Sequence, residues 1–174
     1  MIIKWFDEYL FKRRLKQLPD ITVKETHKFY RTFTSPNPDN RACICDKDGD
    51  QVGSAVYGVS PLFDRIYIYQ IEINKEYRRK GFATAFLMYL TRTHNQAITA
   101  VKELESSYSF WGTTRRFSGV AFIVTHELTV GDMLQEGKRW EHLKSESERL
   151  DKLIEARLIK NEPWEVATGR GFDD

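Results

Sequence analysis

Residues 66 to 90 read IYIYQIEINKEYRRKGFATAFLMYL, and the spacing of their apolar residues changes halfway along. Isoleucines and tyrosines alternate with other side chains over residues 66–73, which predicts a strand. Phe82, Phe86, Tyr89 and Leu90 then fall on one face at helical spacing. The stretch therefore predicts a strand, a short basic turn and an amphipathic helix.

The turn has the features of an anion site. A helix that begins here leaves its first backbone N–H groups unpaired, and the helix dipole adds partial positive charge at the same end. Gly81 lacks a Cβ atom, so it permits a positive φ and lets an anion approach the main chain, and Ala83 keeps the next turn equally small. Arg78, Arg79 and Lys80 add positive charge. We expect a phosphate site, the alternative being an ordinary connection with a solvated basic turn.

The pattern Arg78-x-x-Gly81-x-Ala83 resembles the acyl-CoA-binding motif of the GNAT superfamily of N-acyltransferases, which is Gln or Arg, two residues, Gly, any residue, then Gly or Ala. The resemblance implies an α/β fold with a mixed sheet, acetyl-CoA as co-substrate and an amine as acceptor. It also implies a bulge in the central strand that leaves the main-chain groups of Glu72 to Asn74 free for the pantetheine arm. The implied cofactor-binding residues are Ile71, Ile73, Arg78, Arg79, Lys80, Gly81, Phe82, Ala83 and Thr84.

Two residues are candidates for the proton transfers of this chemistry. Glu72 lies on the central strand and is the candidate general base, unless it is an ordinary solvent-facing glutamate. The family's acid is a tyrosine on a later helix, but this chain has Phe110 and Trp111 at the aligned position, and tryptophan cannot give up a proton. Tyr108, on nearly the same helical face, is the candidate substitute; the alternative is that it only packs against the cofactor.

Length and composition predict one globular domain over residues 1–174. The chain is 41% apolar and 30% charged, and its net charge of +2 is spread along the sequence, which is no nucleic-acid footprint by itself. No apolar run is long enough to span a membrane, and the charged N-terminal stretch lacks the apolar region of a signal peptide. We therefore expect a cytoplasmic protein without a membrane partner.

Metal chemistry is not indicated by the sequence. Cys43 and Cys45 lie two apart in a predicted strand and should face the same side as half-buried residues. The alternatives are a zinc site or a disulfide, which lack a second pair of ligands at suitable spacing. The four histidines are scattered, so no metal site is expected.

The remaining elements surround this centre. A basic amphipathic helix over residues 2–18 should end at Pro19 and cover one face of the domain, although such helices also contact membranes or RNA. The domain core should span about residues 20–130, followed by a helical extension over about 132–160 and a tail over 161–174. Within the core we expect strands over residues 21–34, 41–46, 51–59, 97–105 and 120–130, and a helix over 106–117.

The long helix predicted over residues 132–160 carries an apolar stripe of Trp140, Leu143, Leu150, Ile154 and Leu158. This stripe can bury against its own domain or against a partner, so a homodimer is one outcome. Between the first two strands, Thr34 to Arg41 leave room only for a turn, whereas the family usually has two helices there. Unless the helix of residues 2–18 replaces that wall, the acceptor side is open and suits a protein or an RNA.

The leading interpretation is therefore an acetyl-CoA-dependent N-acetyltransferase that acts on an amine. The open acceptor side favours an amine on a macromolecule, a protein or a tRNA. The main alternative is a catalytically inactive GNAT-fold interaction module that acts through its long C-terminal helix. A third is a toxin that acylates aminoacyl-tRNA, although the family tyrosine is present in such toxins.

Overall fold

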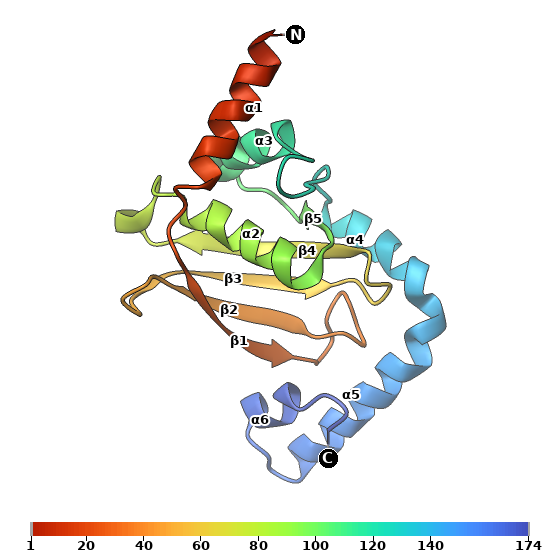
Figure 1. The fold of residues 1–174 in the computed structure, drawn as a ribbon. Helices are drawn as coiled ribbons and strands as arrows, with labels where there is room; N and C mark the ends of the chain where they lie inside the picture. Colours follow the sequence, from red (N-terminus) through yellow and green to blue (C-terminus); the bar gives the residue numbers. More distant parts are fainter. Residues whose placement is uncertain (1, 174) are drawn as a thin grey trace.

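The structure is a computed structural model that describes the backbone of residues 2–173 and the side chains of residues 6–173 (Figure 1). Within this range, five strands form one sheet in the order β1-β2-β3-β4-β5. Their bounds are β1 Thr22–Lys28, β2 Asp39–Cys45, β3 Gln51–Val59, β4 Arg65–Ile73 and β5 Ala97–Ala100. Neighbours are antiparallel except β4 and β5, which are parallel. The mixed α/β sheet expected from the sequence is confirmed.

Strand β4 contains the expected bulge. Tyr57 pairs with Ile68 and Val56 pairs with Gln70, so Tyr69 is an extra residue in β4. Side chains along a strand alternate between the two faces of the sheet, so one extra residue moves every following side chain to the opposite face. This is why Ile66 and Ile68 at even positions share the apolar core with Ile71 and Ile73 at odd positions.

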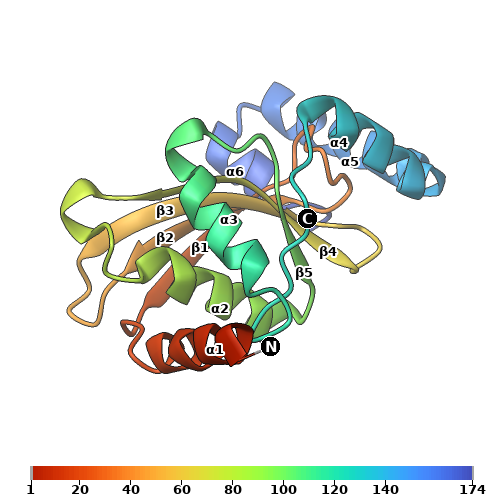
Figure 2. The same cartoon turned by 90° about the horizontal axis from the view of Figure 1, so that it is seen from above.

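One face of the sheet is covered by helix α2 (Phe82–His94), which follows the short 3-10 helix η1 (Lys75–Tyr77). Figure 2 shows α1 (Ile2–Leu15), α2 and α3 (Tyr108–Arg116) together on this side, with α4, α5 and α6 on the other. The main core lies between α2 and the sheet. Its fully buried side chains include Ile44, Val52, Ala55, Tyr57, Ile66, Phe86, Leu87, Leu90 and Ile98.

Helix α1 packs on α3, on the same side of the sheet as α2, and does not cover the opposite face. The Phe11 ring stacks on Phe117 at 4.2 Å and meets Phe122 edge-on at 6.2 Å. Arg116 on α3 forms an ion pair with Asp7 on α1. The helix therefore does not replace the acceptor wall. It ends at Leu15, three residues earlier than expected, and the chain then runs extended past Pro19.

Three predicted strands differ from expectation, and the one over residues 97–105 ends at Ala100. The strand predicted over residues 21–34 ends at Lys28, because a series of turns that includes Pro36 follows it. The prediction of a strand over residues 120–130 was wrong: this segment forms two single bridges, Ile98 with Val124 and Val101 with Leu128. Between them the Glu127 carboxylate accepts the N–H of Glu103 at 2.6 Å, so a side chain interrupts the backbone ladder.

The single helix predicted over residues 132–160 was also wrong. The segment forms α4 (Val130–Glu136), a 3-10 turn η3 (Gly137–Leu143) and α5 (Lys144–Ile159), and α6 (Trp164–Gly169) follows. The break lies at Trp140, whose φ of −121° and ψ of 28° are not helical. This turn brings the indole to 6.3 Å from the Tyr67 ring, so packing against the sheet outweighs helix continuity.

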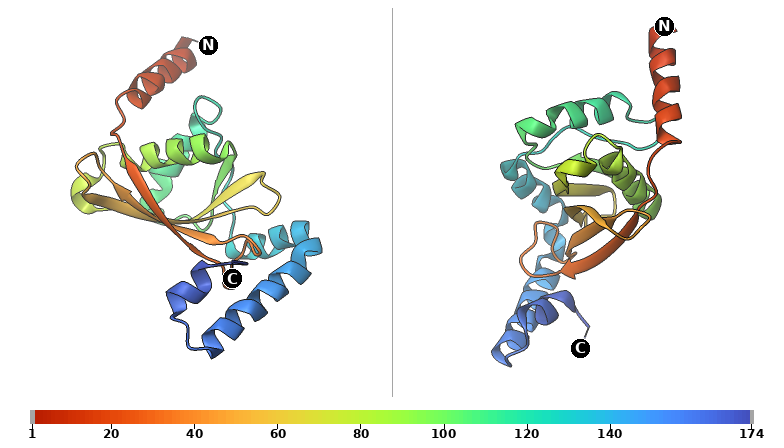
Figure 3. Two further views of the ribbon diagram at one scale, coloured as in Figure 1. Left: turned by 60° about the horizontal axis from the view of Figure 1, so that its bottom comes forward. Right: turned by 90° about the vertical axis from the view of Figure 1, so that its left-hand side faces the viewer.

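The apolar stripe is covered by the chain itself. Leu150 and Ile154 are 1% and 0% exposed in the single chain, and Trp140 is 4% exposed. The left view of Figure 3 shows α5 and α6 folded back beneath β1, and the Phe29 N–H donates to the Thr168 carbonyl at 2.9 Å. Burial within its own domain is thus confirmed for these three residues, and the homodimer stays a prediction. No described helix is long and apolar enough to cross a membrane.

Candidate active site

Strands β4 and β5 separate beyond the middle of β4. Their parallel pairing ends where Ile68 pairs with Ala100, and the Val101 N–H donates to the Ile68 carbonyl at 2.9 Å. Strand β4 continues to Ile73. In residues 2–173 no strand pairs with this last part of β4 on the β5 side, so its edge is unpaired; we call this unpaired edge the gap between β4 and β5.

The main-chain groups of Ile71 and Ile73 face this gap. The Asn74 N–H donates to the Val52 carbonyl at 2.8 Å, toward β3. Because main-chain groups alternate sides along an antiparallel strand, those of Glu72 also face β3 while those of Ile71 and Ile73 face away. The expectation that Glu72 to Asn74 are all free was therefore wrong. The Ile73 carbonyl accepts a hydrogen bond of 2.8 Å from Arg78 Nε.

The predicted turn from strand to helix lies at the same end of β4. Gly81 has φ 93° and is the N-cap of α2, and the first bond of the helix runs from the Ala85 N–H to the Gly81 carbonyl at 2.9 Å. In the described chain, no hydrogen bond satisfies the four amides of Gly81 to Thr84. Such unpaired amides at the positive end of a helix favour an anion.

Gly81 is required for a further reason. A Cβ atom there would lie 3.0 Å from Leu18 Cδ2 and 3.3 Å from Pro19 Cδ, so the linker between α1 and β1 fills that side. The missing Cβ atom of Gly81 therefore permits both the positive φ and this close packing. Tyr77 and Phe82 meet edge-on at 5.7 Å and hold the turn, and Lys80 Nζ lies 5.3 Å from the Tyr77 ring.

Glu72 is exposed and lies opposite Ser54 of β3 on the face away from α2. Its expected position on the less apolar face is confirmed, since Ile71 and Ile73 pack against the core. Tyr108 is the first residue of α3 and is 54% exposed. Trp111 is only 3% exposed and belongs to the core, which gives it a structural role.

An ion pair attaches α3 to the end of β5. The Glu103 carboxylate, 2% exposed, binds the Arg115 guanidinium through two hydrogen bonds, one of 3.0 Å. The hydrogen bond with Glu103 raises the pKa of Arg115 further. A buried carboxylate is costly unless paired, so this pair fixes the orientation of α3 and with it the position of Tyr108.

On the side opposite α2, α4 and η3 pack over part of β4, where Tyr67 is buried with Met133 and Trp140, and another part of that face is open. A cavity of about 560 Å³ lies on this open part, and most of its lining residues are polar. The connection between β1 and β2, residues 29–38, contains turns and no helix. The lining residues are Lys24, Thr26, Lys28, Asp39, Arg41, Ala42, Cys43, Gln51, Ser54, Ala55, Val56 and Gln70.

Three polar side chains crowd one end of this face. A Cβ atom on Gly58 would lie 2.6 Å from Tyr69 Oη and 2.7 Å from Thr34 Oγ1. These two oxygens and Asp39 Oδ1 are buried without a hydrogen-bond partner among the described residues. Burial and the charge of Asp39 raise the pKa of Tyr69. Sequence reasoning missed this cluster, because its members come from three separate segments.

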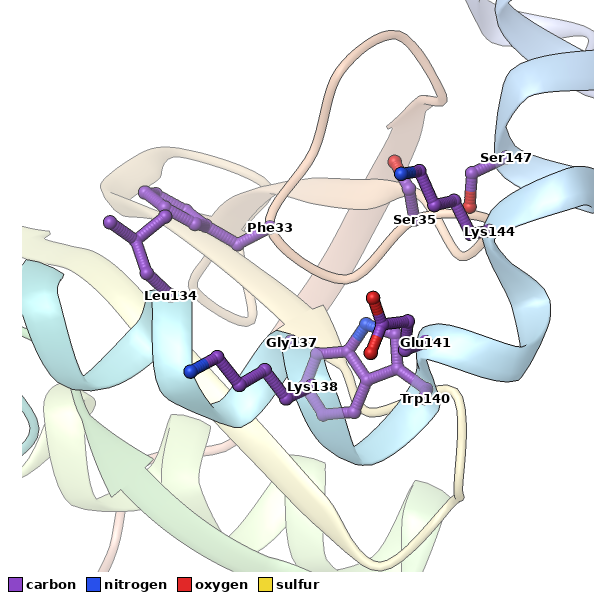
Figure 4. A pocket seen from close by; sticks show the side chains of 9 residues that line it. All are labelled: Phe33, Ser35, Leu134, Gly137, Lys138, Trp140, Glu141, Lys144 and Ser147. Atoms are coloured by element: carbon purple, nitrogen blue, oxygen red, sulfur yellow. The ribbon is translucent and has the colours of Figure 1, made fainter.

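A second, smaller cavity of about 270 Å³ lies between the turns after β1 and the C-terminal helices. Figure 4 shows Phe33 and Leu134 close together at one side and Trp140 on the η3 side, with Lys138 and Lys144 extending along the opening. This cavity also depends on the break at Trp140, so local patterns could not predict it.

Residues 2–109 match the sequence model of the family described as Acetyltransferase (GNAT) family. The match covers α1, the sheet, α2 and the first two residues of α3, and it ends before the C-terminal helices. No curated protein matches the chain.

Proposed function

Because the chain belongs to the GNAT acetyltransferase family, we propose that it transfers an acetyl group from acetyl-CoA to an amine. The observation that carries this proposal is the gap between β4 and β5 beside the N-terminus of α2. There, unpaired main-chain groups that suit a pantetheine arm adjoin unpaired amides that suit a pyrophosphate. Both lie at one end of β4.

The proposed cofactor-binding residues divide into two groups. The amides of Gly81 to Thr84 would hold the pyrophosphate, with Arg78, Arg79 and Lys80 adding positive charge. The main-chain groups of Ile71 and the N–H of Ile73 would bind the acyl-pantetheine arm, since the Ile73 carbonyl already accepts from Arg78. The Ile73 N–H is our candidate for stabilising the oxyanion of the tetrahedral intermediate, since it faces the gap.

The acceptor would approach from the open face of the sheet. Helix α2 and its core fill the other face, so the gap is accessible to a second substrate from the side that carries Glu72. The cavity of about 560 Å³ and the short connection over residues 29–38 leave this side wide. This supports an amine carried by a protein or an RNA. Efficient turnover of free small amines would count against it.

Glu72 and Tyr108 are the proposed proton-transfer residues. On the open face, Glu72 would take a proton from the acceptor amine, directly or through a water. Tyr108 would return a proton to the leaving thiolate from the start of α3. We expect Tyr108→Phe to lower kcat at least about tenfold and to leave the affinity for acetyl-CoA unchanged. Unchanged kcat would mean that Tyr108 only packs against the cofactor.

The alternative of an interaction module acting through the long helix rested on the missing family tyrosine, but it loses the surface that it would use. Its surface was the apolar stripe, and the central residues of that stripe, Leu150 and Ile154, are buried within the chain. The acetyltransferase proposal is therefore the one that we carry forward.

Thermal unfolding with and without acetyl-CoA tests the proposal. Acetyl-CoA at 100 times its dissociation constant should add about 2.7 kcal/mol to the free energy of unfolding, a rise in Tm of about 5 to 10 °C. Ala83→Glu should abolish the rise, because its carboxylate repels the pyrophosphate, while an acid in the first turn leaves the helix stable.

The matched control is Ser145→Glu. Ser145 is exposed and occupies the same position at the start of α5 that Ala83 occupies in α2. This variant should keep the full rise in Tm. Equal rises for both variants would contradict binding at the N-terminus of α2.

A further inference from the structure

Three basic side chains gather on the open part of the sheet. Lys24 and Lys28 of β1 and Arg41 of β2 all line the cavity of about 560 Å³. None of the three forms a salt bridge with a described residue. A cavity lined by cations that the chain itself leaves without an ion pair attracts an anionic ligand.

One carboxylate shares the cavity with these cations. Asp39 lies opposite Lys28 on the neighbouring strand, and its Oδ1 atom is buried, so part of its charge faces away from a ligand. Lys28 Nζ also lies 5.5 Å from the Trp164 ring. Lys24 and Arg41 are both exposed, so they are the cations most available to a ligand. The cavity therefore has an excess of positive charge, concentrated at these two residues.

The cavity lies on the same face as Glu72, at a distance that the strand register defines. One row of paired residues crosses the four strands: Lys24, Cys43, Ser54 and Glu72. Neighbouring strands lie about 4.8 Å apart, so the main chain at Lys24 is about 14 Å from that at Glu72. Arg41 is two residues from Cys43 and lies about 12 Å from Glu72 by the same geometry. An acceptor whose amine lies at Glu72 would therefore meet the cations about 12 to 14 Å further on.

This distance and the lining of the cavity favour a peptide over an RNA. An extended peptide spans about 12 to 14 Å in roughly four residues. No aromatic residue lines the cavity, so unpaired bases would find no surface to stack on. Asp39 also places a negative charge among the cations, which disfavours a continuous chain of phosphates more than single carboxylates.

We propose that the open cavity binds an acidic segment of a protein acceptor. Lys24 and Arg41 contact carboxylates about four residues from the residue that carries the amine, and Lys28 adds to the positive field. The proposal rests on the proposed function, because it specifies the acceptor of the same site. Complementary charge of this kind contributes mainly to the choice of partner and to the rate of association.

The test is fluorescence anisotropy with two labelled peptides of about 13 residues. Both have a central lysine; one carries glutamates three to five residues away on each side, and the other carries glutamines at the same positions. We expect the glutamate peptide to bind at least about tenfold more tightly at low salt. The preference should shrink as salt is added, because exposed charges are screened.

Lys24→Gln and Arg41→Gln should each lower the affinity for the glutamate peptide about threefold or more and leave that for the glutamine peptide unchanged. The matched control is Lys12→Gln, which removes the same charge from an exposed residue of α1, on the other side of the sheet. It should bind both peptides as the wild type does. All three variants should keep the rise in Tm with acetyl-CoA, which shows that they fold.

Equal binding of the two peptides, or an equal loss of affinity in Lys12→Gln, would overturn the proposal. So would an RNA hairpin that binds more tightly than the glutamate peptide and depends on Lys24 and Arg41, since the acceptor would then be an RNA. The acetyl-CoA measurement separates this proposal from the proposed function. A rise in Tm without a preference for the glutamate peptide contradicts the acidic acceptor alone, whereas the preference without the rise contradicts the cofactor site alone.

Discussion

The two faces of the sheet differ sharply although the same strands build both. Toward α2, residues such as Val52, Tyr57 and Ile66 are buried in one apolar core. Away from α2, polar residues of the same strands line an open cavity, Lys24, Arg41, Ser54 and Gln70 among them. Because side chains alternate along a strand, one sequence can serve both tasks. Stability and acceptor recognition should therefore respond to different substitutions.

The largest effect is expected on the α2 face. Phe86 is fully buried and packs edge-on against Tyr57 at 6.2 Å. We expect Phe86→Ala to lower the free energy of unfolding by about 3 to 5 kcal/mol, because it leaves a cavity in the core. Urea unfolding measures this. Ser54→Ala on the open face should stay within about 0.5 kcal/mol, and similar losses for both variants would remove the distinction between the faces.

The second prediction concerns Glu72 on the open face. If Glu72 is the general base, Glu72→Gln should lower kcat/KM about 100-fold while the Tm rise with acetyl-CoA is kept. Steady-state kinetics with an acceptor and thermal unfolding measure the two effects separately. Wild-type activity in this variant would make Glu72 an ordinary solvent-facing glutamate.

The third prediction concerns the carboxylate of Asp39, whose burial disfavours its charged form. Burial raises the pKa of Asp39 to about 6, although Lys28 and Arg41 lower it. The folded state therefore binds this proton more tightly than the unfolded chain, and stability falls as pH rises from about 4 to 6. Asp39→Asn should add about 3 kcal/mol above pH 7 and almost nothing near pH 3.5.

Thermal unfolding of Asp39→Asn and wild type at both pH values checks this prediction. A loss of stability in the variant near neutral pH would mean that the ionised carboxylate makes a favourable interaction. It would also remove Asp39 from the set of groups that the open face holds without hydrogen-bond partners.

The smallest effect is expected from His94, at the end of α2, and it has the opposite sign. Burial lowers the pKa of His94, while Glu25 raises it. The unfolded chain therefore binds this proton more tightly, so stability is complete above about pH 6.5 and falls as pH decreases. His94→Gln should flatten the acid side of the stability profile between about pH 5 and 7, which thermal unfolding over that range measures. An unchanged slope would contradict the assignment.

Local patterns allowed the centre of the fold to be predicted. The strand, the turn at Gly81 and the helix over residues 82–94 depend on spacing within one stretch, so the sequence alone indicated them. The bulge in β4 is also visible in the spacing of apolar residues along the sequence. The apolar positions change from Ile66 and Ile68 to Ile71 and Ile73, which is what an extra residue at Tyr69 requires.

Features that depend on contacts between distant segments could not be predicted. The helix break at Trp140 exists because its indole packs near Tyr67, and no local residue requires it. The bond from Asn74 to Val52 depends on the register of β3, and this register decides which main-chain groups face the gap. The contact of 3.7 Å between Cys43 Sγ and Cys45 Sγ depends on a register shift for the same reason.

Hydrogen exchange of single backbone amides, followed by NMR with and without acetyl-CoA, tests the cofactor site most directly. If acetyl-CoA binds there, exchange should slow at Gly81 to Thr84, Ile71 and Ile73, because these unpaired N–H groups would gain acceptors. Amides of β1 and β2, which pair with each other, should not change. Slower exchange on β1 and β2 with no change at Gly81 to Thr84 would contradict the cofactor site and the division of tasks between the two faces.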